Sequence, residues 1–210
     1  AVMTDGSTTL VVAALVLVTC VVLRQFLMSE ENRRLLTMVA DQAFRDPLTG
    51  LANRALFADR LAHAVALRRR DGRGVAVLSV DLDDFKRIND TRGHRAGDDA
   101  LVAVGRALTQ AVSDTAAVVV RSGGEEFIVA VTSGTGEAPP VARRICDGIS
   151  ALPLSITASV GTACARLNDT SLGEHQARLQ ELITASDAAM YRAKRLGGNQ
   201  CGHHELCSTG

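Results

Sequence analysis

The chain has 210 residues, enough for one well-cored domain with an appendage but short for two full domains. Its 23 basic and 23 acidic side chains cancel, so there is no global basic field to recruit nucleic acid and no acidic excess to indicate disorder. Five cysteines, an odd number at irregular spacing, do not form the pattern of a small secreted disulfide-rich protein and favour a reducing compartment.

The first predicted element is an apolar segment near the N-terminus. No charged residue lies between Gly6 and Leu23, and the apolar residues Phe26, Leu27 and Met28 could extend the run if the Arg24 side chain snorkels to the membrane surface. A run of this length approaches the roughly 20 residues of a spanning helix. We therefore predict a transmembrane helix with its flank over residues 1–28, contacting the membrane through residues 6–28. A signal peptide is the alternative, although no basic cluster precedes the run and no small-residue cleavage site follows it. A buried core helix fits less well because the run has no polar face.

The residues after this segment predict its orientation. Arginines follow it at Arg24, Arg33 and Arg34 and none precedes it, so the positive-inside tendency favours an inner-membrane protein with a cytoplasmic body. Residues 29–44 form a predicted helical linker whose apolar stripe could pair with a second copy, and a single amphipathic connector is equally compatible. A start at Ala1 is compatible with the last span and output domain of a longer protein.

The cytoplasmic body is predicted to interleave helices and strands. The expected helices cover 56–65, 96–112, 139–149 and 178–195, and the expected strands cover 75–80, 116–120, 127–131 and 155–163. A glycine pair, Gly123-Gly124, joins two of these strands in a hairpin. This pattern predicts an α/β fold with a central, mostly antiparallel sheet flanked by helices over residues 45–200. Residues 201–210 are predicted to be a flexible tail, and soft metal ligation by their cysteines and histidines is the less favoured alternative.

Two acidic clusters follow predicted strands. Asp81 begins the first and Glu125 the second, directly after the glycine pair. Carboxylates at a hairpin tip can simply point into water. If both strands share one sheet, however, the clusters meet at one edge, and hard oxygen ligands from two strands suit Mg²⁺. Magnesium with a nucleoside triphosphate indicates phosphoryl or nucleotidyl transfer.

The positions of the lysines also point to phosphate binding. Lys86 and Lys194 are the only two in the chain, and Lys86 lies just beyond the first acidic cluster. A compact ammonium group suits phosphate neutralisation in a tight pocket, although chance placement is also compatible.

At this point the residues resemble a known family, the GGDEF-domain diguanylate cyclases, in a variant with Gly-Gly-Glu-Glu-Phe at the hairpin. The resemblance covers about residues 45–200 and implies a fold related to palm-type nucleotidyl cyclases. Five ordered motifs carry it: Asp46-Pro-Leu-Thr-Gly-Leu-Ala-Asn-Arg54, Asp81-Leu-Asp-Asp-Phe-Lys-Arg-Ile-Asn-Asp90, Gly93-His-Arg-Ala-Gly-Asp98, Arg121-Ser-Gly-Gly-Glu-Glu-Phe127 and Ala185-Ser-Asp-Ala-Ala-Met-Tyr-Arg-Ala-Lys194.

The resemblance implies a reaction in which two GTP molecules condense to cyclic di-GMP and release pyrophosphate. The implied Mg²⁺ ligands are Asp81, the Leu82 carbonyl and Glu125. The implied substrate contacts are Asn89 and Asp98 to guanine with His94 nearby, and Phe85, Lys86, Lys194, Gly123 and Gly124 to the phosphates. Glu126 is the implied base for the 3′-hydroxyl, or a group that positions it.

The resemblance also implies that dimerisation controls the activity. One domain binds one GTP, so two domains must face each other, and a membrane helix with a linker could set that homodimer.

The family's inhibitory product site has Arg and Asp where this chain has Asp114 and Ala117, so we expect no feedback inhibition by the product through that site. Gly198 replaces a common basic residue and weakens the expected triphosphate contact. A catalytically silent module that binds GTP or a partner is therefore the second hypothesis, and a purely structural membrane protein is the third.

Overall fold

The structure is a computed structural model that describes residues 3–53, 56–57, 74–132, 135–165 and 172–205. The chain divides into two units, residues 1–43 and residues 44–210, and each is described by itself.

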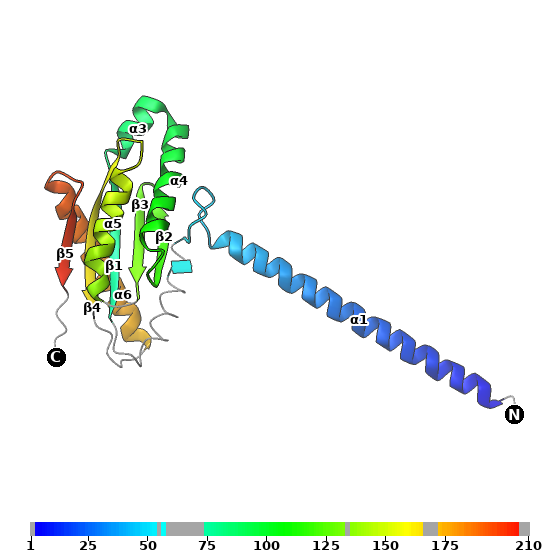
Figure 1. The fold of residues 1–210 in the computed structure, drawn as a ribbon. Coiled ribbons are helices and arrows are strands. Elements are labelled where there is room, and N and C mark those ends of the chain that lie inside the picture. The colour runs from blue at the N-terminus through cyan, green and yellow to red at the C-terminus, as the bar shows by residue number, and fades with distance from the viewer. Residues whose placement is uncertain (1–2, 54–55, 58–73, 133–134, 166–171, 206–210) are drawn as a thin grey trace. The chain divides into compact units, whose positions relative to one another are not determined.

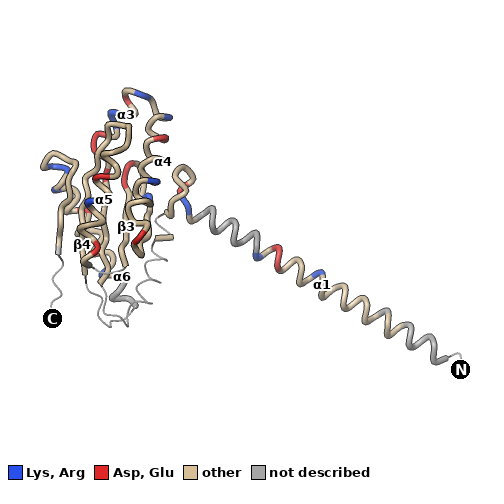
Figure 2. Tube along the Cα trace, viewed as in Figure 1, with Lys and Arg blue, Asp and Glu red and all other residues tan. Residues whose placement is uncertain are grey.

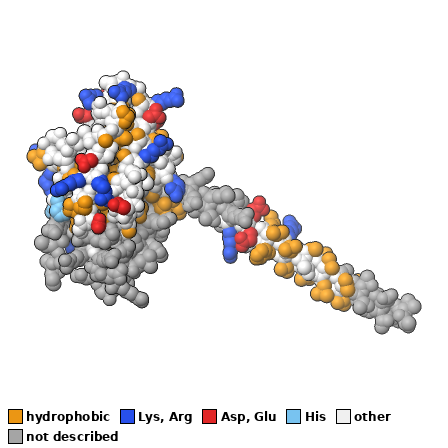
Figure 3. All heavy atoms as spheres, viewed as in Figure 1, with side chains coloured by type: hydrophobic (Ala, Val, Ile, Leu, Met, Phe, Trp, Pro, Cys, Tyr) orange, Lys and Arg blue, Asp and Glu red, His pale blue; other side chains and the backbone are white. Residues whose placement is uncertain are grey.

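The first unit is one helix, α1 (Met3–Ala43). Its stretch Leu10–Arg33, 24 residues with a mean hydropathy of 2.5, is long and apolar enough to cross a membrane, and none of it is buried. Figure 3 shows hydrophobic side chains along this stretch, and in Figure 2 charged residues appear only toward its C-terminal part. The helix continues without a break through the predicted linker. The side chains of residues 34–43, which carry most of the predicted pairing stripe, lie outside the described residues.

The second unit is built on a five-stranded sheet in the order β2-β3-β1-β4-β5 (Figure 1). Its strands are β1 (Val75–Asp83), β2 (Ala117–Gly123), β3 (Glu126–Val131), β4 (Thr157–Ala165) and β5 (Cys201–Glu205). Every neighbouring pair is antiparallel except β4 and β5, which are parallel. The predicted mostly antiparallel sheet is therefore confirmed.

Helices cover both faces of this sheet, as Figure 1 shows. The helices are α3 (Phe85–Arg92), α4 (His94–Ala111), α5 (Ala138–Ser150), which follows the short 3₁₀ turn η1 (Thr135–Glu137), and α6 (Leu172–Arg195). Side chains alternate along β1, so Leu78 and Val80 pack into the core with α4 and α5, whereas Val75 and Val77 belong to the core on the α6 side. All four are fully buried, and each contributes about 1.5–3 kcal/mol by leaving water.

A glycine on β4 sets how closely α6 approaches the sheet. A Cβ atom built at Gly161 would lie 2.1 Å from the backbone nitrogen of Met190 and 2.1 Å from the backbone oxygen of Ser186. Only a residue without a side chain lets helix and strand backbones pack this closely. This contact positions the C-terminal end of α6, which carries Lys194, beside β1.

The structure differs from the sequence predictions at three places, and each difference has a physical cause. β1 continues to Asp83 because its pairing with β4 extends to Asp83 and Thr157. The helix α3 was not predicted, since its sequence is short and mostly polar. The expected flexible tail is wrong for residues 201–205, which form β5 through backbone pairing with β4. Most of the predicted 56–65 helix lies outside the described residues.

Candidate functional site

The carboxyl end of β1 gathers the first acidic cluster. Asp81 and Asp83 lie within the strand and, two residues apart, point to the α6 side, whereas Leu82 between them is fully buried on the opposite side. The register sets Asp81 opposite Glu126 on β3 and opposite Ser159 on β4. The central position of β1 therefore brings the two predicted acidic clusters to one edge, as the sequence indicated.

Lys194 from α6 pairs with this cluster. Its Nζ atom forms an ion pair with Asp81 Oδ1, and the Asp81 side chain keeps only 11% of its exposure. Partial burial alone would lower the pKa of Lys194, but the hydrogen bond to Asp81 and the charges of Asp81, Glu125 and Asp83 outweigh it and raise that pKa above its ordinary value. The amine is therefore a stable cation beside three carboxylates.

Glu125 completes this group from the hairpin between β2 and β3. The Leu82 N–H donates to the Glu125 carbonyl at 3.4 Å, which fixes the tip against β1. Burial, followed by the negative charge of Asp81, raises the pKa of the Glu125 carboxyl, and Lys194 opposes this only in part. The two carboxylates thus repel each other, which is the electrostatic setting that a bound dication would relieve.

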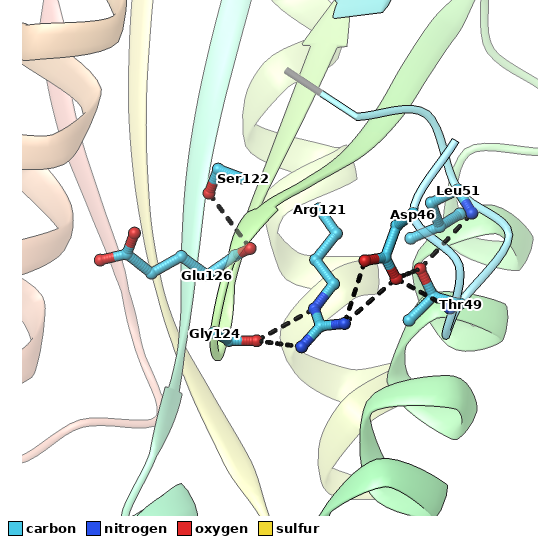
Figure 4. Close-up of polar contacts among 7 residues, drawn as sticks. All are labelled: Asp46, Thr49, Leu51, Arg121, Ser122, Gly124 and Glu126. Carbon is cyan, nitrogen blue, oxygen red and sulfur yellow. Dashed lines mark hydrogen bonds and ion pairs between the residues drawn. The ribbon is translucent and has the colours of Figure 1, made fainter. Parts of the chain in front are cut away.

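The hairpin tip itself is held by a clamp, defined here as Asp46, Arg121 and the Gly124 carbonyl (Figure 4). Arg121 donates to the Gly124 carbonyl from Nε at 3.0 Å and from Nη2 at 2.8 Å, and from Nη1 to both Asp46 oxygens at 3.1 and 3.2 Å. Thr49 donates to Asp46 Oδ1 from its backbone N–H at 2.8 Å and its hydroxyl at 2.6 Å. The clamp therefore joins the segment after α1 to the proposed metal-binding turn.

The clamp also sets the ionisation of its carboxylate. Partial burial would raise the pKa of Asp46, but the Thr49 hydrogen bonds and the Arg121 guanidinium together hold it below its ordinary value. Gly124 adopts φ +52°, a conformation that favours glycine, so its carbonyl can face the Arg121 fork. Both Asp46 and Arg121 stand in the quoted motifs, yet sequence reasoning assigned them no role.

Glu126 lies on the other side of the tip. Its backbone carbonyl accepts a hydrogen bond from Ser122 Oγ at 3.1 Å, and its exposed carboxylate points away from Arg121 in Figure 4. The side chain borders a cavity of about 280 Å³ between the sheet and α6, whose other lining residues include Ser79, Asp187 and Tyr191. Within the described part of the chain, no hydrogen bond or ion pair engages this carboxylate.

The predicted nucleotide contacts lie on α3 and α4. Phe85 is buried at the start of α3 and Lys86 is exposed beside it. Asn89 packs against α4 so closely that a Cβ atom at Gly97 would lie 2.0 Å from Asn89 Oδ1. This contact brings Asn89 next to the turn of α4 that carries Asp98.

Other predicted residues are not drawn into the acidic cluster. His94 and Asp98 are exposed on the first turns of α4. Among the described residues, no hydrogen bond or ion pair joins Lys86, His94 or Asp98 to the group of Asp81, Glu125 and Lys194. The part of the chain that the structure describes contains no set of three or more His, Cys, Asp or Glu side chains that could hold a metal ion. The predicted metal set has only two such side chains and takes its third ligand from the Leu82 backbone.

Gly198 is explained by its neighbour Asp83. It has φ +71°, and a Cβ atom there would lie 2.8 Å from Asp83 Cγ. Asp83 accepts hydrogen bonds from Thr157 Oγ1 and Ser159 Oγ, both at 2.7 Å, and from the Asn199 N–H at 2.8 Å. Asp83 therefore fastens the turn after α6 to β1 and β4.

The structure describes both positions that correspond to the family's inhibitory product site. Asp114 forms an ion pair with Arg144 at 3.0 Å on the protein surface, and Ala117 is the first residue of β2.

Comparison with known proteins identifies similar sequences. The family described as "Diguanylate cyclase, GGDEF domain" matches residues 43–200. The diguanylate cyclase DgcP of Pseudomonas aeruginosa is 38% identical over 164 residues, 74% of this chain and 23% of that protein. The probable diguanylate cyclase DgcC of Escherichia coli K12 is 34% identical over 174 residues, 82% of this chain and 45% of that protein. The chain thus spans less than half the length of either relative.

Solved structures have the same fold. The coiled coil and GGDEF domain of DgcB from Caulobacter crescentus, in complex with c-di-GMP, matches with a TM-score of 0.71 and 28% identity over 84% of this chain and 94% of that one. A GGDEF domain of TpbB, also called YfiN, from Pseudomonas aeruginosa matches with a TM-score of 0.65 and 31% identity over 77% and 95% of the two chains.

Proposed function

Because this chain belongs to the GGDEF family of diguanylate cyclases, we propose that it condenses two molecules of GTP into cyclic di-GMP and releases pyrophosphate. One observation carries the proposal. Asp81, Glu125 and Lys194, which lie far apart in the sequence, meet at the end of β1 with a raised pKa on Glu125. A site built from repelling carboxylates and a lysine is suited to a metal–triphosphate complex.

The donor set fits a hard divalent cation. Asp81 and Glu125 supply carboxylate oxygens from two neighbouring segments, and the Leu82 carbonyl supplies a neutral oxygen. Bound Mg²⁺ would neutralise charge on the triphosphate during in-line displacement. Lys194, kept cationic by Asp81, would bind the phosphates together with Lys86 and the Phe85 backbone amide. Absence of side chains at Gly123 and Gly124 lets the phosphates approach the hairpin.

The remaining residues would orient the substrate and move its proton. Asn89 and Asp98 carry the donor and acceptor groups that guanine requires, and His94 lies one turn before Asp98 on the same face of α4. Glu126 would accept the 3′-hydroxyl proton, since its carboxylate is exposed and unengaged within the described residues. The clamp would keep both glutamates of the tip in register with β1.

We further propose that the domain is tethered to the inner membrane through α1, faces the cytoplasm and acts as a homodimer. The apolar stretch Leu10–Arg33 supports the tether by its length and hydropathy. Two tethered copies would meet at a raised effective concentration, so alignment of their helices could control the encounter of two GTP-loaded domains.

A silent GTP-binding module is the second candidate, and Gly198 favours it. The position that commonly holds a basic residue in the family packs here against the Asp83 carboxylate, which leaves Lys194 and Lys86 as the proposed cationic contacts to phosphate. Product feedback is not expected in either case, because Asp114 and Ala117 lack the residue types of the inhibitory site and Asp114 pairs with Arg144.

The decisive experiment incubates the purified full chain, in detergent micelles or liposomes, with GTP and Mg²⁺ and separates the nucleotides by chromatography. We expect cyclic di-GMP and pyrophosphate. A folded chain that binds GTP in the presence of Mg²⁺ without making product would favour the silent module.

The matched control is Glu125→Gln, which keeps the shape of the side chain and removes its charge. We expect loss of turnover together with loss of the Mg²⁺-dependent part of GTP binding, measured by titration. Unchanged Mg²⁺ dependence in this variant would contradict the metal assignment. Inhibition by micromolar product that an Asp114→Ala change relieves would contradict the absence of feedback.

A further inference from the structure

Two cysteines outside the proposed nucleotide site face each other. Cys146 is buried on α5, and Cys201 is the exposed first residue of β5. Their sulfur atoms lie 3.2 Å apart although 55 positions separate them in the sequence. We propose that Cys146 and Cys201 form a redox-sensitive dithiol that a peroxide converts into an intramolecular disulfide.

Packing holds the two sulfurs together. Cys146 belongs to the core beneath α5, and its Sγ atom also lies 3.9 Å from the Ala158 carbonyl oxygen on β4. Cys201 is fixed by the ladder that pairs it with Val160 on the same strand. Because β4 anchors both residues, a bond of about 2.05 Å between the sulfurs requires a shift of about 1 Å and no rearrangement of elements.

The environment gives the two thiols different roles. The hydrogen bond from Cys146 lowers the pKa of Cys201, the partial burial of its sulfur opposes this, and the positive charge of Arg143 adds to the lowering. The same hydrogen bond, together with burial, raises the pKa of Cys146. Thiolates are the reactive form of cysteine, so the exposed Cys201 is the residue that reacts first, and Cys146 resolves the product.

The chemistry balances with hydrogen peroxide as the oxidant. The Cys201 thiolate attacks one peroxide oxygen, the O–O bond breaks, and the released hydroxide takes a proton to become water, leaving a sulfenic acid on Cys201. The Cys146 sulfur then attacks Cys201 Sγ. The S–O bond breaks as the S–S bond forms, and the departing hydroxide takes the Cys146 proton as a second water. Two thiols are oxidised and one peroxide is reduced.

The disulfide would tie α5 to the first residue of β5, directly after the turn that leads from α6. That turn includes Asn199, whose N–H binds Asp83, and Gln200, whose carbonyl accepts from the Val160 N–H at 3.0 Å. Cys201 follows these residues directly, so oxidation would restrain the segment that leads from Lys194 to the sheet edge.

The test maps the cross-link and needs no enzymatic activity, so its failure is separate from failure of the proposed function. The full chain in detergent micelles is reduced, exposed to hydrogen peroxide, denatured, alkylated with N-ethylmaleimide and digested with trypsin. The Cys146 peptide also contains Cys164, and the Cys201 peptide also contains Cys207. We expect these two peptides to be linked after oxidation and released by dithiothreitol.

Four variants assign the bond. Cys146→Ser and Cys201→Ser should each abolish the linked peptide, and the exposed position of Cys201 makes its variant the one least prone to misfolding. Cys164→Ala and Cys207→Ser are the matched controls and should retain it. A linked peptide that persists in Cys201→Ser would overturn the proposal. So would full alkylation of both cysteines in peroxide-treated wild-type protein.

Discussion

Two arginine–aspartate pairs in the second unit have the same chemistry and different settings. Arg121 and Asp46 meet at 3.1 Å with side chains that retain 13% and 18% of their exposure. Arg144 and Asp114 meet at 3.0 Å with 38% and 72%. The first pair holds the tip that carries Glu125, whereas the second joins α5 to the loop before β2. Because the two distances are nearly equal, burial and shared partners, rather than the distance between the charges, decide how much each ion pair contributes to the stability of the fold.

The largest expected effect is that of Asp46→Ala. It removes the acceptor of the Thr49 hydrogen bonds and leaves the mostly buried Arg121 guanidinium without its carboxylate. We expect the free energy of unfolding to fall by about 3 kcal/mol, measured by denaturant titration of the full chain in micelles. An equal loss in Asp114→Ala would remove the distinction between the two pairs.

The next effect is that of Arg121→Lys, which keeps the charge and loses the planar fork. Lysine cannot bind the Gly124 carbonyl and both Asp46 oxygens in the same geometry. We expect a loss of about 1–2 kcal/mol in stability and a drop of about tenfold or more in the rate of cyclic di-GMP formation, because the tip would shift. A stable variant with wild-type turnover would show that the clamp does not position the tip.

The pH dependence of stability tests the buried pair of Asp46 and Arg121. The pKa of Asp46 lies below its ordinary value of 3.8, so the folded state binds fewer protons than the unfolded state near that pH. The stabilisation is present above the ordinary value and is lost as the pH falls through the folded-state pKa. The gap in unfolding free energy between wild type and Asp46→Asn should therefore narrow below about pH 4. A gap that stays constant from pH 7 to pH 3 would contradict this assignment.

The smallest effect is expected for Asp114→Ala. Its side chain is mostly exposed, and Arg144 keeps a hydrogen bond from Nε to the Ala111 carbonyl at 2.8 Å. We expect a change of no more than about 0.5 kcal/mol in the free energy of unfolding, which salt would reduce further. Measurement at low and high salt tests this, and a loss above about 1 kcal/mol would contradict the comparison.

The sequence predicted the sheet and its acidic edge because local patterns determine them. Apolar runs such as Val75–Val80 identify buried strands, and the glycine pair at Gly123 identifies the hairpin that returns Glu125 toward β1. The resemblance added the proposed nucleotide-binding residues.

The sequence could not predict features that depend on distant partners. Asp46 and Arg121 are 75 positions apart, and neither is unusual in its own segment. The strand β5 has the sequence Cys-Gly-His-His-Glu, which lacks apolar alternation and becomes a strand only because β4 offers a free edge. The approach of Cys146 to Cys201 follows from that pairing, so the sequence could not predict it either.

The parallel strand β5 has a practical consequence for anyone who shortens this protein. The region matching the family ends at residue 200, yet the backbone groups of β4 from Val160 to Cys164 are paired by residues 201–205. A chain cut at residue 200 would leave β4 as an open edge, a template for pairing between molecules and thus for aggregation. The last five described residues therefore belong to the folding unit, and a soluble version of the domain should retain them.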